Sequence, residues 1–217
     1  MAGRSRGIGD TGHATRVAVV RCIVVAIIAT IVLAGLVALV FWLVVRPKPI
    51  EYIITRAVVR HFNVTPPGAG SAGGGGGGTV NATFYLILAV DNPNRRVSMR
   101  YDRVELRVLY GENGTQLATA ELPAFHQPRR NETLLQARAV ARSTPVPDQA
   151  ARELEHDLAA GELVSVEVRV VADVRFIVSG VISRYYRVRG TCSPVNIGLS
   201  PSAARSFESV PCDVEIW

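Results

Sequence analysis

Histidine, the side chain that most often carries protons in catalysis, is sparse in this sequence. The four histidines stand far apart, at His13, His61, His126 and His156. His156 lies between Glu155 and Asp157 in a helix-like segment, where an exposed position is expected. The sequence contains no Gly-x-Ser-x-Gly elbow, no Walker loop and no His-Glu-x-x-His motif. We therefore expect a protein without enzymatic activity and without a bound cofactor.

The carboxylates and thiols also lack the spacing that acid–base or metal chemistry needs. Asp102 and Glu105 lie three residues apart in a strand-like segment, which predicts that they point to opposite faces. Two carboxylates on opposite faces cannot act together as acid and base. Cys192 and Cys212 have no histidine near them in the sequence, so no zinc site is expected.

Four Asn-x-Ser/Thr triplets could carry N-linked glycans. They begin at Asn63, Asn81, Asn113 and Asn131. All four follow the apolar segment 22–45, and none precedes it. Because glycans are added on the lumenal side of the secretory pathway, this distribution favours a lumenal or extracellular location for the C-terminal part of the chain.

The three cysteines fit the same orientation. Cys22 stands at the start of the apolar segment, where it could pack against neighbours or carry a palmitoyl group. Cys192 and Cys212 fall in the exported part, where disulfides are allowed and these two cysteines have one possible pairing. We expect a Cys192–Cys212 disulfide.

A cluster of arginines could suggest a nucleic-acid site. The cluster consists of Arg95, Arg96, Arg100, Arg103 and Arg107. Acidic residues are interleaved with it, and no stacking aromatics follow the basic positions, so nucleic acid is not expected as a partner. We expect an exposed strand face with cross-strand ion pairs. The alternative is a basic patch that binds an acidic wall polymer, an anionic lipid or a partner protein.

The elements that position these residues begin with a membrane segment. The chain has 217 residues, 48% of them apolar, and a net charge of +6. Residues 22–45 carry no charge and would span about 36 Å as a helix, which is enough to cross a bilayer. A cleaved signal peptide is the alternative, but its apolar region is about 7–15 residues long and ends in small residues. Here the segment ends at Arg46-Pro47-Lys48-Pro49.

The predicted organisation is a basic cytosolic tail (1–21), a transmembrane helix (22–45) and an extracellular domain (46–217). Basic residues flank the apolar segment on both sides, so the positive-inside rule, which compares Lys and Arg on the two sides, hardly favours either orientation. The predicted orientation therefore rests on the glycosylation triplets. A stripe of small residues could also let two helices associate. It consists of Ala26, Thr30, Ala34 and Ala38.

The exported part is predicted to be a β-sandwich of about seven strands with one short helix. Apolar and polar residues alternate, or β-branched residues gather, over 50–64, 80–90, 97–110, 133–140, 164–176 and 184–189. A phase slip near Tyr101-Asp102-Arg103 predicts a β-bulge, and Gly111–Gly114 has the composition of a hairpin turn. Residues 147–161 read as a short helix that ends at Gly161.

A Gly-rich stretch, residues 68–78, interrupts the strand pattern and includes six consecutive glycines. It lacks the Gly-Lys-Ser/Thr ending of a phosphate-binding loop and leads directly into a strand. We expect it to be a flexible insert between strands.

Several motifs together resemble the plant harpin-induced, non-race-specific-disease-resistance-like family, whose outer domain is of the late-embryogenesis-abundant type 2. The matching pieces are Asn92-Pro93-Asn94, Tyr101-Asp102, Leu122-Pro123-Ala124-Phe125, the valine-rich strand leading to Arg175-Phe176, and Tyr186–Val188 running into Cys192 with Cys212 beyond. The basic N-terminus and apolar anchor resemble the family too. The Gly-rich insert is unusual for it.

The resemblance implies a seven-stranded immunoglobulin- or fibronectin-like sandwich anchored in the plant plasma membrane. It also implies a non-catalytic role in defence or stress signalling. A protectant of membranes or proteins during dehydration is the alternative function. A hydrolase using His126, Asp102 and His156 is the third, enzymatic hypothesis.

Overall fold

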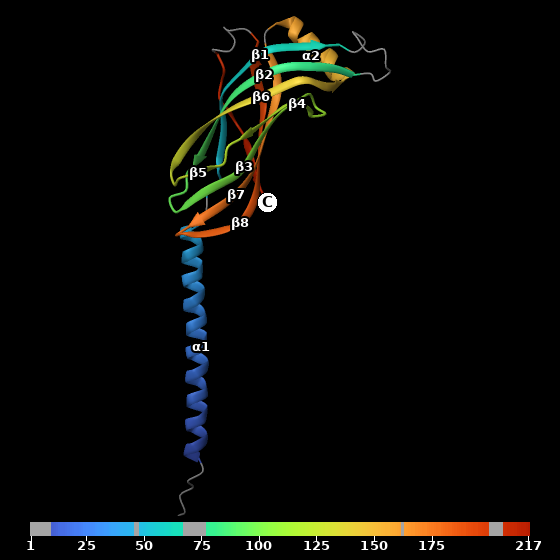
Figure 1. Ribbon diagram of the computed structural model, residues 1–217. Helices are drawn as coiled ribbons and strands as arrows, with labels where there is room; N and C mark the ends of the chain where they lie inside the picture. The colour runs from blue at the N-terminus through green and yellow to red at the C-terminus, as the bar shows by residue number, and fades with distance from the viewer. Residues whose placement is uncertain (1–9, 46–47, 67–76, 162, 200–205) are drawn as a thin grey trace, which may run out of the picture. The chain divides into compact units, whose positions relative to one another are not determined.

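The structure is a computed structural model that describes residues 10–45, 48–66, 77–161, 163–199 and 206–217 (Figure 1). The chain divides into two compact units, Met1–Arg46 and Pro47–Trp217. Most of the predicted Gly-rich insert lies outside the described residues.

The described part of the first unit is one helix, α1 (Asp10–Val45). Its segment Val19–Val40 is long and apolar enough to cross a membrane, by length and composition, and its side chains are exposed. The helix is therefore consistent with a membrane anchor. It begins earlier than the apolar segment 22–45 because residues 10–21 include alanines and arginines, which extend an existing helix at little cost.

The second unit is built on one antiparallel sheet whose described strands number ten (Figure 1). In chain order they are β1 (Glu51–Thr65), β2 (Gly77–Asn92), β3 (Val97–Tyr110), β4 (Thr115–Leu122), β5 (Phe125–Gln127), β6 (Asn131–Pro147), β7 (Leu163–Val178), β8 (Val181–Gly198), β9 (Val210–Pro211) and β10 (Asp213–Ile216). The order across the sheet is β10-β8-β7-β3-β4-β6-β2-β1-β9, and β5 pairs with β3 beside this path.

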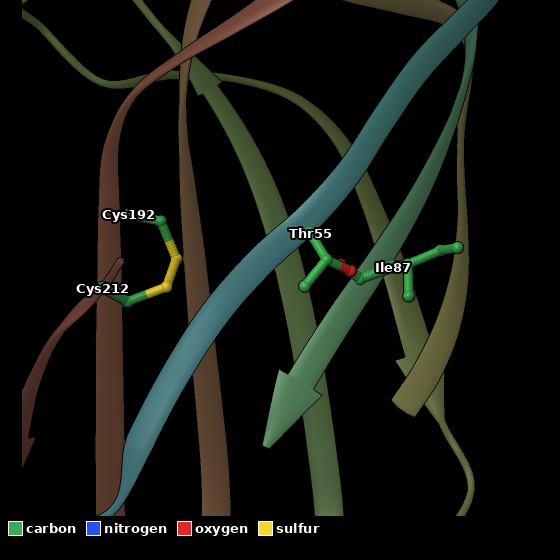
Figure 2. Close-up of a disulfide and its surroundings, with 4 residues drawn as sticks. All are labelled: Thr55, Ile87, Cys192 and Cys212. Carbon is green, nitrogen blue, oxygen red and sulfur yellow. A yellow bond between two sulfur atoms is a disulfide. The ribbon is translucent and has the colours of Figure 1, made fainter. Parts of the chain in front are cut away.

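The two ends of this sheet are joined by consecutive short strands, so the sheet closes almost into a barrel. Strand β9 pairs with β1 at Ile53 and Ile54, while β10 pairs with residues 188–191 of β8. Between them, the N–H of Cys212 donates to the carbonyl of Tyr52 at 2.9 Å. Figure 2 shows the Cys192–Cys212 disulfide beside β1; it connects the closing segment to β8.

The predicted mainly-β class is confirmed, and the part of the chain that the structure describes has ten strands where about seven were predicted. Three strands, β5, β9 and β10, have only two to four residues, too few to produce an alternating pattern in the sequence. The near-closure was not predicted either, because it depends on pairing between segments at opposite ends of the domain.

The core forms where alternate strand positions turn inward. In β7, Val164, Val166, Val168 and Val170 are all buried, as the period-two pattern predicts. Close approach is required at Gly190, where an added Cβ would lie 2.5 Å from Cδ2 of the buried Tyr52 ring.

The predicted short helix is confirmed as α2 (Asp148–Ala160). Its buried residues Ala151 and Leu154 face the core, and Gly161 ends it in the left-handed region at φ 77°. Tyr110, the last residue of β3, donates its hydroxyl to Oδ2 of Asp157 at 2.8 Å. The helix is thus held against the end of the sheet.

The predicted bulge in β3 is confirmed by a register shift between Tyr101 and Arg103. The bulge absorbs one residue of the alternation, so Asp102 and Glu105 both lie on the half-exposed outer side of β3. The prediction that these two carboxylates occupy opposite faces is therefore wrong. The hairpin turn is confirmed, with the N–H of Gly114 donating to the carbonyl of Gly111 at 3.1 Å.

Candidate interaction surfaces

One end of the β domain is defined by the residues where β1 begins, and we call it the anchor end. The register places the start of β1, the β2–β3 loop, the start of β6 and the β7–β8 hairpin together at this end. The pairs that show it are Glu51 with Asp91, Asn92 with Asn131, Val97 with Val178, and Val178 with Val181. The anchor end therefore comprises residues 48–51, 91–97, 128–132 and 178–184.

Two buried asparagines organise the anchor end. The N–H of Lys48 donates to Oδ1 of Asn94 at 2.8 Å, and Nδ2 of Asn94 donates to the carbonyl of Lys48 at 3.0 Å. Asn92 donates to the carbonyls of Val97 at 2.9 Å and Pro128 at 2.8 Å. Its Oδ1 also accepts from the N–H and Nδ2 of Asn94, each at 3.1 Å. Together, the two side chains connect three chain segments, at Lys48, at residues 92–97 and at Pro128.

Gln127 extends this polar network inward and was not predicted. It is fully buried, and its Nε2 donates to the carbonyls of Val90, at 3.0 Å, and Asn131. Arg130 completes the arrangement through its N–H, which donates to the carbonyl of Asn94 at 3.1 Å. The composition of Asn92-Pro93-Asn94 predicted only a turn, and nothing in the pattern around Gln127 marked it as buried.

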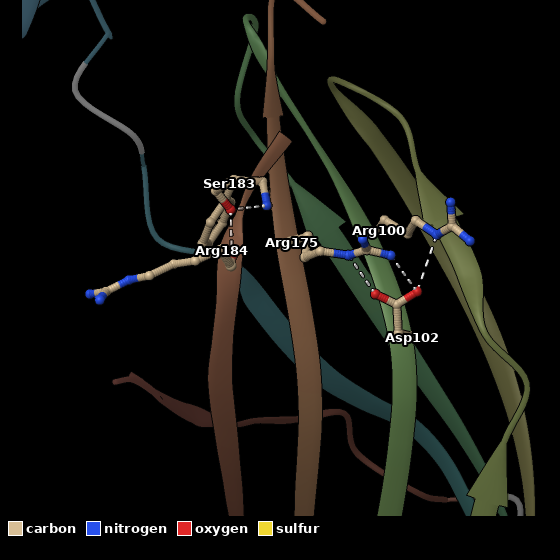
Figure 3. A network of polar contacts seen from close by, with 6 residues as sticks. Arg100, Asp102, Arg175, Ser183 and Arg184 are labelled. Carbon is tan, nitrogen blue, oxygen red and sulfur yellow. Dashed lines mark hydrogen bonds and ion pairs between the residues drawn. The ribbon is translucent and has the colours of Figure 1, made fainter. Parts of the chain in front are cut away.

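The outer face of β3 and β7 carries a charged network centred on Asp102 (Figure 3). Arg175 donates from Nε to Oδ2 of Asp102 at 2.8 Å and from Nη2 to Oδ1 at 3.0 Å. Arg100 adds a third contact, Nε to Oδ1, at 3.1 Å. The hydrogen bonds from Arg175 hold the pKa of the Asp102 carboxyl below its ordinary value. Asp102–Arg175 is a cross-strand ion pair of the kind expected on this face.

Other charged and aromatic side chains continue this face. Glu105 pairs with Arg107 at 2.7 Å within β3, and the pKa of Glu105 is lowered chiefly by that hydrogen bond. Arg175 also lies 4.7 Å from the centre of the Tyr185 ring, in cation–π geometry. Most of the basic charge here is therefore compensated within the face.

The residues of the hydrolase hypothesis are not assembled into a site. His126 lies on β5 in register with Arg100, and His156 is exposed on α2. Asp102 is engaged by two guanidinium groups and has a lowered pKa, so it is charged near neutral pH and cannot act there as a general acid. Over the described ranges, no group of three His, Cys, Asp or Glu side chains could hold a metal ion.

The second half of β1 forms an open sheet edge. Its pairing with β9 is limited to Ile53 and Ile54, and within the described chain the residues after Ile54 have only β2 as a strand neighbour. At the bulge between Ile54 and Arg56, Thr55 donates its hydroxyl to the carbonyl of Ile87 at 3.3 Å (Figure 2). The bulge and the exposed Arg56 and Arg60 limit uncontrolled pairing at this edge.

A groove of about 1210 Å³ runs beside the second half of β1. Its apolar lining includes Val59 and Phe62 from β1, Leu158 from α2 and Leu199 after β8. Arg56, Arg60 and His61 also line it, which gives the groove a basic side. An apolar groove beside free backbone donors and acceptors can accept an extended peptide as an additional strand.

The four candidate glycosylation sites are distributed over the β domain. Asn63 on β1, Asn113 in the β3–β4 turn and Asn131 at the start of β6 are exposed. Asn81 is half-buried on β2, and its Oδ1 accepts from the N–H of Ser143 at 2.8 Å. Three of the four side chains are therefore exposed in the folded domain.

The candidate residues of α1 are all exposed: Cys22, Ala26, Thr30, Ala34 and Ala38. Cys22 is a free thiol. The hydroxyl of Thr30 donates within the helix, to the carbonyls of Ala26 at 3.0 Å and Ile27 at 2.8 Å. Self-association through this stripe would therefore depend on close packing of small residues, and it stays a prediction.

The family profile described as "Late embryogenesis abundant protein" matches residues 88–192, from β2 to the disulfide cysteine of β8. This part of the β domain is thus similar to late embryogenesis abundant proteins. This match contains the charged face, the bulge of β3 and most of the Asn92–Gln127 network.

Three Arabidopsis thaliana proteins extend the similarity beyond residues 88–192. An uncharacterized protein is 27% identical over 91% of this chain and 84% of its own length. NDR1/HIN1-like protein 10 is 27% identical over 87% of this chain and 80% of its own. NDR1/HIN1-like protein 3 is 24% identical over 87% of this chain and 78% of its own length. The resemblance to the harpin-induced, disease-resistance-like family is thus confirmed.

A solved structure from Archaeoglobus fulgidus is also similar. It covers 73% of this chain and 94% of its own, at 11% identity and a TM-score of 0.27. A likeness this distant says nothing about function.

Proposed function

We propose that the chain is a single-pass plasma-membrane protein of plants that acts, without catalysis, in defence or stress responses through its outer β domain. The observation that carries the proposal is the similarity to NDR1/HIN1-like proteins over 87% of the chain. A similarity of that extent takes in more than the β domain, and the apolar segment Val19–Val40 is suited to anchor the chain. Asp102 is held in an ion pair and the histidines are dispersed over the chain, which is consistent with a role in binding instead of catalysis.

In this proposal the N-terminus is cytosolic and the β domain is extracellular. Exposed acceptor asparagines and a disulfide across the near-closed sheet both suit an exported domain. The test is glycosylation mapping of the full chain expressed in plant cells. Endoglycosidase should increase gel mobility, and Asn113→Gln should remove one discrete step of that shift. An unglycosylated β domain that is protected from external protease would contradict the orientation.

The surface that we assign to partner binding is the open edge of β1 with its groove. A suitable occupant is an extended protein segment whose apolar side chains fill the space between Phe62, Leu158 and Leu199. Acidic residues flanking that segment would complement Arg56 and Arg60, both exposed. We expect no nucleic-acid partner.

Proximity labelling tests this assignment. A labelling enzyme fused to the C-terminus of the full chain should mark a set of neighbours in challenged plant cells. Arg56→Glu with Arg60→Glu should deplete that set, because both substitutions invert charge at the groove. Arg142→Glu, an exposed arginine on β6, is the matched control and should leave the set unchanged. Equal depletion by all variants, or by none, would contradict the assignment.

The second candidate function is protection during dehydration, which the description of the matching family favours. The two functions predict different phenotypes. Plants that lack the gene should support more pathogen growth under the defence proposal, whereas under the protectant hypothesis they should lose desiccation survival with pathogen growth unchanged.

A further inference from the structure

The anchor end of the β domain follows the membrane segment directly in the chain. Lys48 comes three positions after Val45, the last residue of α1. Its backbone is hydrogen-bonded to the side chain of Asn94 at the anchor end. Three residues of chain reach at most about 11 Å. If Val19–Val40 spans a bilayer, the anchor end must therefore stay close to that bilayer.

The β7–β8 hairpin presents apolar side chains at this end. Val181 is 72% exposed, the highest value of any large apolar side chain in the described ranges, and Ile182 is 51% exposed. They follow the tight turn Ser179-Gly180, in which both residues have positive φ. Val181 and Ile182 are adjacent, and a contiguous exposed apolar patch with a polar rim is typical of protein or membrane contact sites.

Exposed arginines surround this tip. They are Arg95 and Arg96 in the β2–β3 loop, Arg129 and Arg130 before β6, and Arg184 on β8. In contrast to the charged face around Asp102, the described residues provide no ion pair for any of these five. Figure 3 shows Arg184 extending away from the Asp102 network, and its guanidinium lies 5.2 Å from the Tyr186 ring centre.

Acidic side chains at the anchor end do not compensate this charge. They are Glu51, Asp91 and Glu132, and they are outnumbered by the arginines together with Lys48. Guanidinium groups bind phosphate oxygens through paired hydrogen bonds, and phospholipid headgroups carry a phosphate in either leaflet of a membrane. The apolar tip of the hairpin therefore matches the acyl-chain region of a bilayer surface, and the surrounding arginines match its phosphate-bearing headgroups.

We propose that the anchor end is a membrane-docking surface that inserts Val181 and Ile182 among the lipids of the bilayer crossed by α1 and binds their phosphates with the surrounding arginines. This rests on the proposed single-pass anchoring. The hairpin is rigid enough for the role, because Val178 is paired with both Val97 and Val181 and the N–H of Phe176 donates to Ser183 Oγ at 2.9 Å. Docking would fix the orientation of the β domain and of the β1 groove.

The test uses the full chain in lipid nanodiscs. Val181→Cys, made in a Cys22→Ser background with the disulfide intact, is labelled with the environment-sensitive fluorophore NBD. Insertion by about 5–10 Å would bring the label to the headgroup–acyl boundary, so we expect roughly half of its fluorescence to be quenched by doxyl-labelled lipid. The matched control is Glu112→Cys in the β3–β4 turn, an exposed position at the opposite end of β3, which should show no quenching.

The arginines are tested in the same discs with added phosphatidylglycerol. Arg95→Gln with Arg96→Gln should reduce quenching at position 181, since each arginine near an anionic surface strengthens binding about fivefold. Arg142→Gln with Arg152→Gln, two exposed arginines on β6 and α2 outside the anchor end, is the matched control and should have no effect.

Two results would overturn the proposal. One is an unquenched label at position 181, and the other is equal quenching at positions 181 and 112. A loss of binding to soluble polygalacturonate in the Arg95/Arg96 variant, with position 181 unquenched, would instead assign the arginines to an acidic wall polymer. None of these outcomes depends on the glycosylation mapping. A failure of docking with Asn113 glycosylated would thus leave the proposed orientation standing.

Discussion

The backbone of Lys48 and the side chain of Asn94 form a reciprocal pair of hydrogen bonds, at 2.8 and 3.0 Å. An asparagine side chain carries the same kinds of donor and acceptor as a peptide group, so Asn94 satisfies both backbone groups of Lys48 before β1 begins at Glu51. Asn92 Oδ1 accepts hydrogen bonds from the N–H and Nδ2 of Asn94, and Asn92 Nδ2 donates to the carbonyl of Pro128. The chain segment that leads into the β domain is thereby fixed to two loops.

Asn94→Ala should destabilise the β domain by about 1–3 kcal/mol, because it removes both hydrogen bonds to the Lys48 backbone and the bond from Asn94 Nδ2 to Asn92. Asn94 is only 6% exposed, so water does not replace the lost bonds freely. Thermal unfolding of the full chain in detergent is the measurement. Asn196→Ala, on the exposed side of β8, should change the stability by no more than about 0.5 kcal/mol. Equal effects of the two substitutions would show that the Lys48 contact contributes nothing.

Removal of the disulfide should lower the free energy of unfolding by about 3 kcal/mol, since it closes a loop with a sequence separation of 20. The variant is Cys192→Ala with Cys212→Ala. Hydrogen exchange should accelerate most in β9 and β10, whose pairing is short, and much less in the long β2–β6 pair. Cys22→Ser is the control and should leave both measurements unchanged. Uniform acceleration through the sheet would contradict this account of closure.

The sequence predicts best those features that repeat along one strand or helix. The alternation of Val164–Val174 and the helix Asp148–Ala160 are both properties of a single continuous segment. Closure of the sheet depends on Cys212 meeting Tyr52, two residues at opposite ends of the β domain, in strands too short to have a period. Burial of Gln127 depends likewise on the carbonyls of Val90 and Asn131, and no local pattern encodes that.

Bulges show the limit of periodicity even within one strand. The phase slip near Tyr101 correctly predicted the bulge, yet the faces of Asp102 and Glu105 were derived from an uninterrupted alternation. One inserted residue reverses the facing of everything that follows it. An alternation that shifts by one residue at Tyr101–Arg103 puts both carboxylates on the outer side.

Gly190→Ala should destabilise the β domain by about 1–3 kcal/mol through overpacking. In an unconstrained strand this substitution would be favourable, because alanine loses less backbone entropy than glycine. Here the new Cβ would lie 2.5 Å from Cδ2 and 3.2 Å from Cε2 of Tyr52, whose ring is 1% exposed. Thermal unfolding decides the sign, with Ser165→Ala on the exposed side of β7 as the control. A more stable Gly190→Ala protein would mean that the Tyr52 ring moves without cost.

Asp102→Asn should remove a pH-dependent contribution to stability. The folded-state pKa of Asp102 is lowered, first by its hydrogen bonds to Arg175, so the folded domain holds the charged form more strongly than the unfolded chain does. That contribution is complete above the unfolded pKa of about 3.9 and is lost as the pH falls through the lower folded value. Because the pair is partly exposed, we expect the wild-type melting temperature to exceed that of the variant by at most a few degrees near pH 7.

The difference between wild type and Asp102→Asn should shrink as the pH is lowered below about 4. Repeating the pair of melting curves in an Arg175→Gln background separates this ion pair from other causes. With Arg175 replaced, the guanidinium that lowers the Asp102 pKa most is gone, and only the contact with Arg100 is left. The pH dependence should then be largely abolished. A dependence that persists unchanged in that background would show that Arg175 is not its source, and would leave the cross-strand pair without a measurable role in stability.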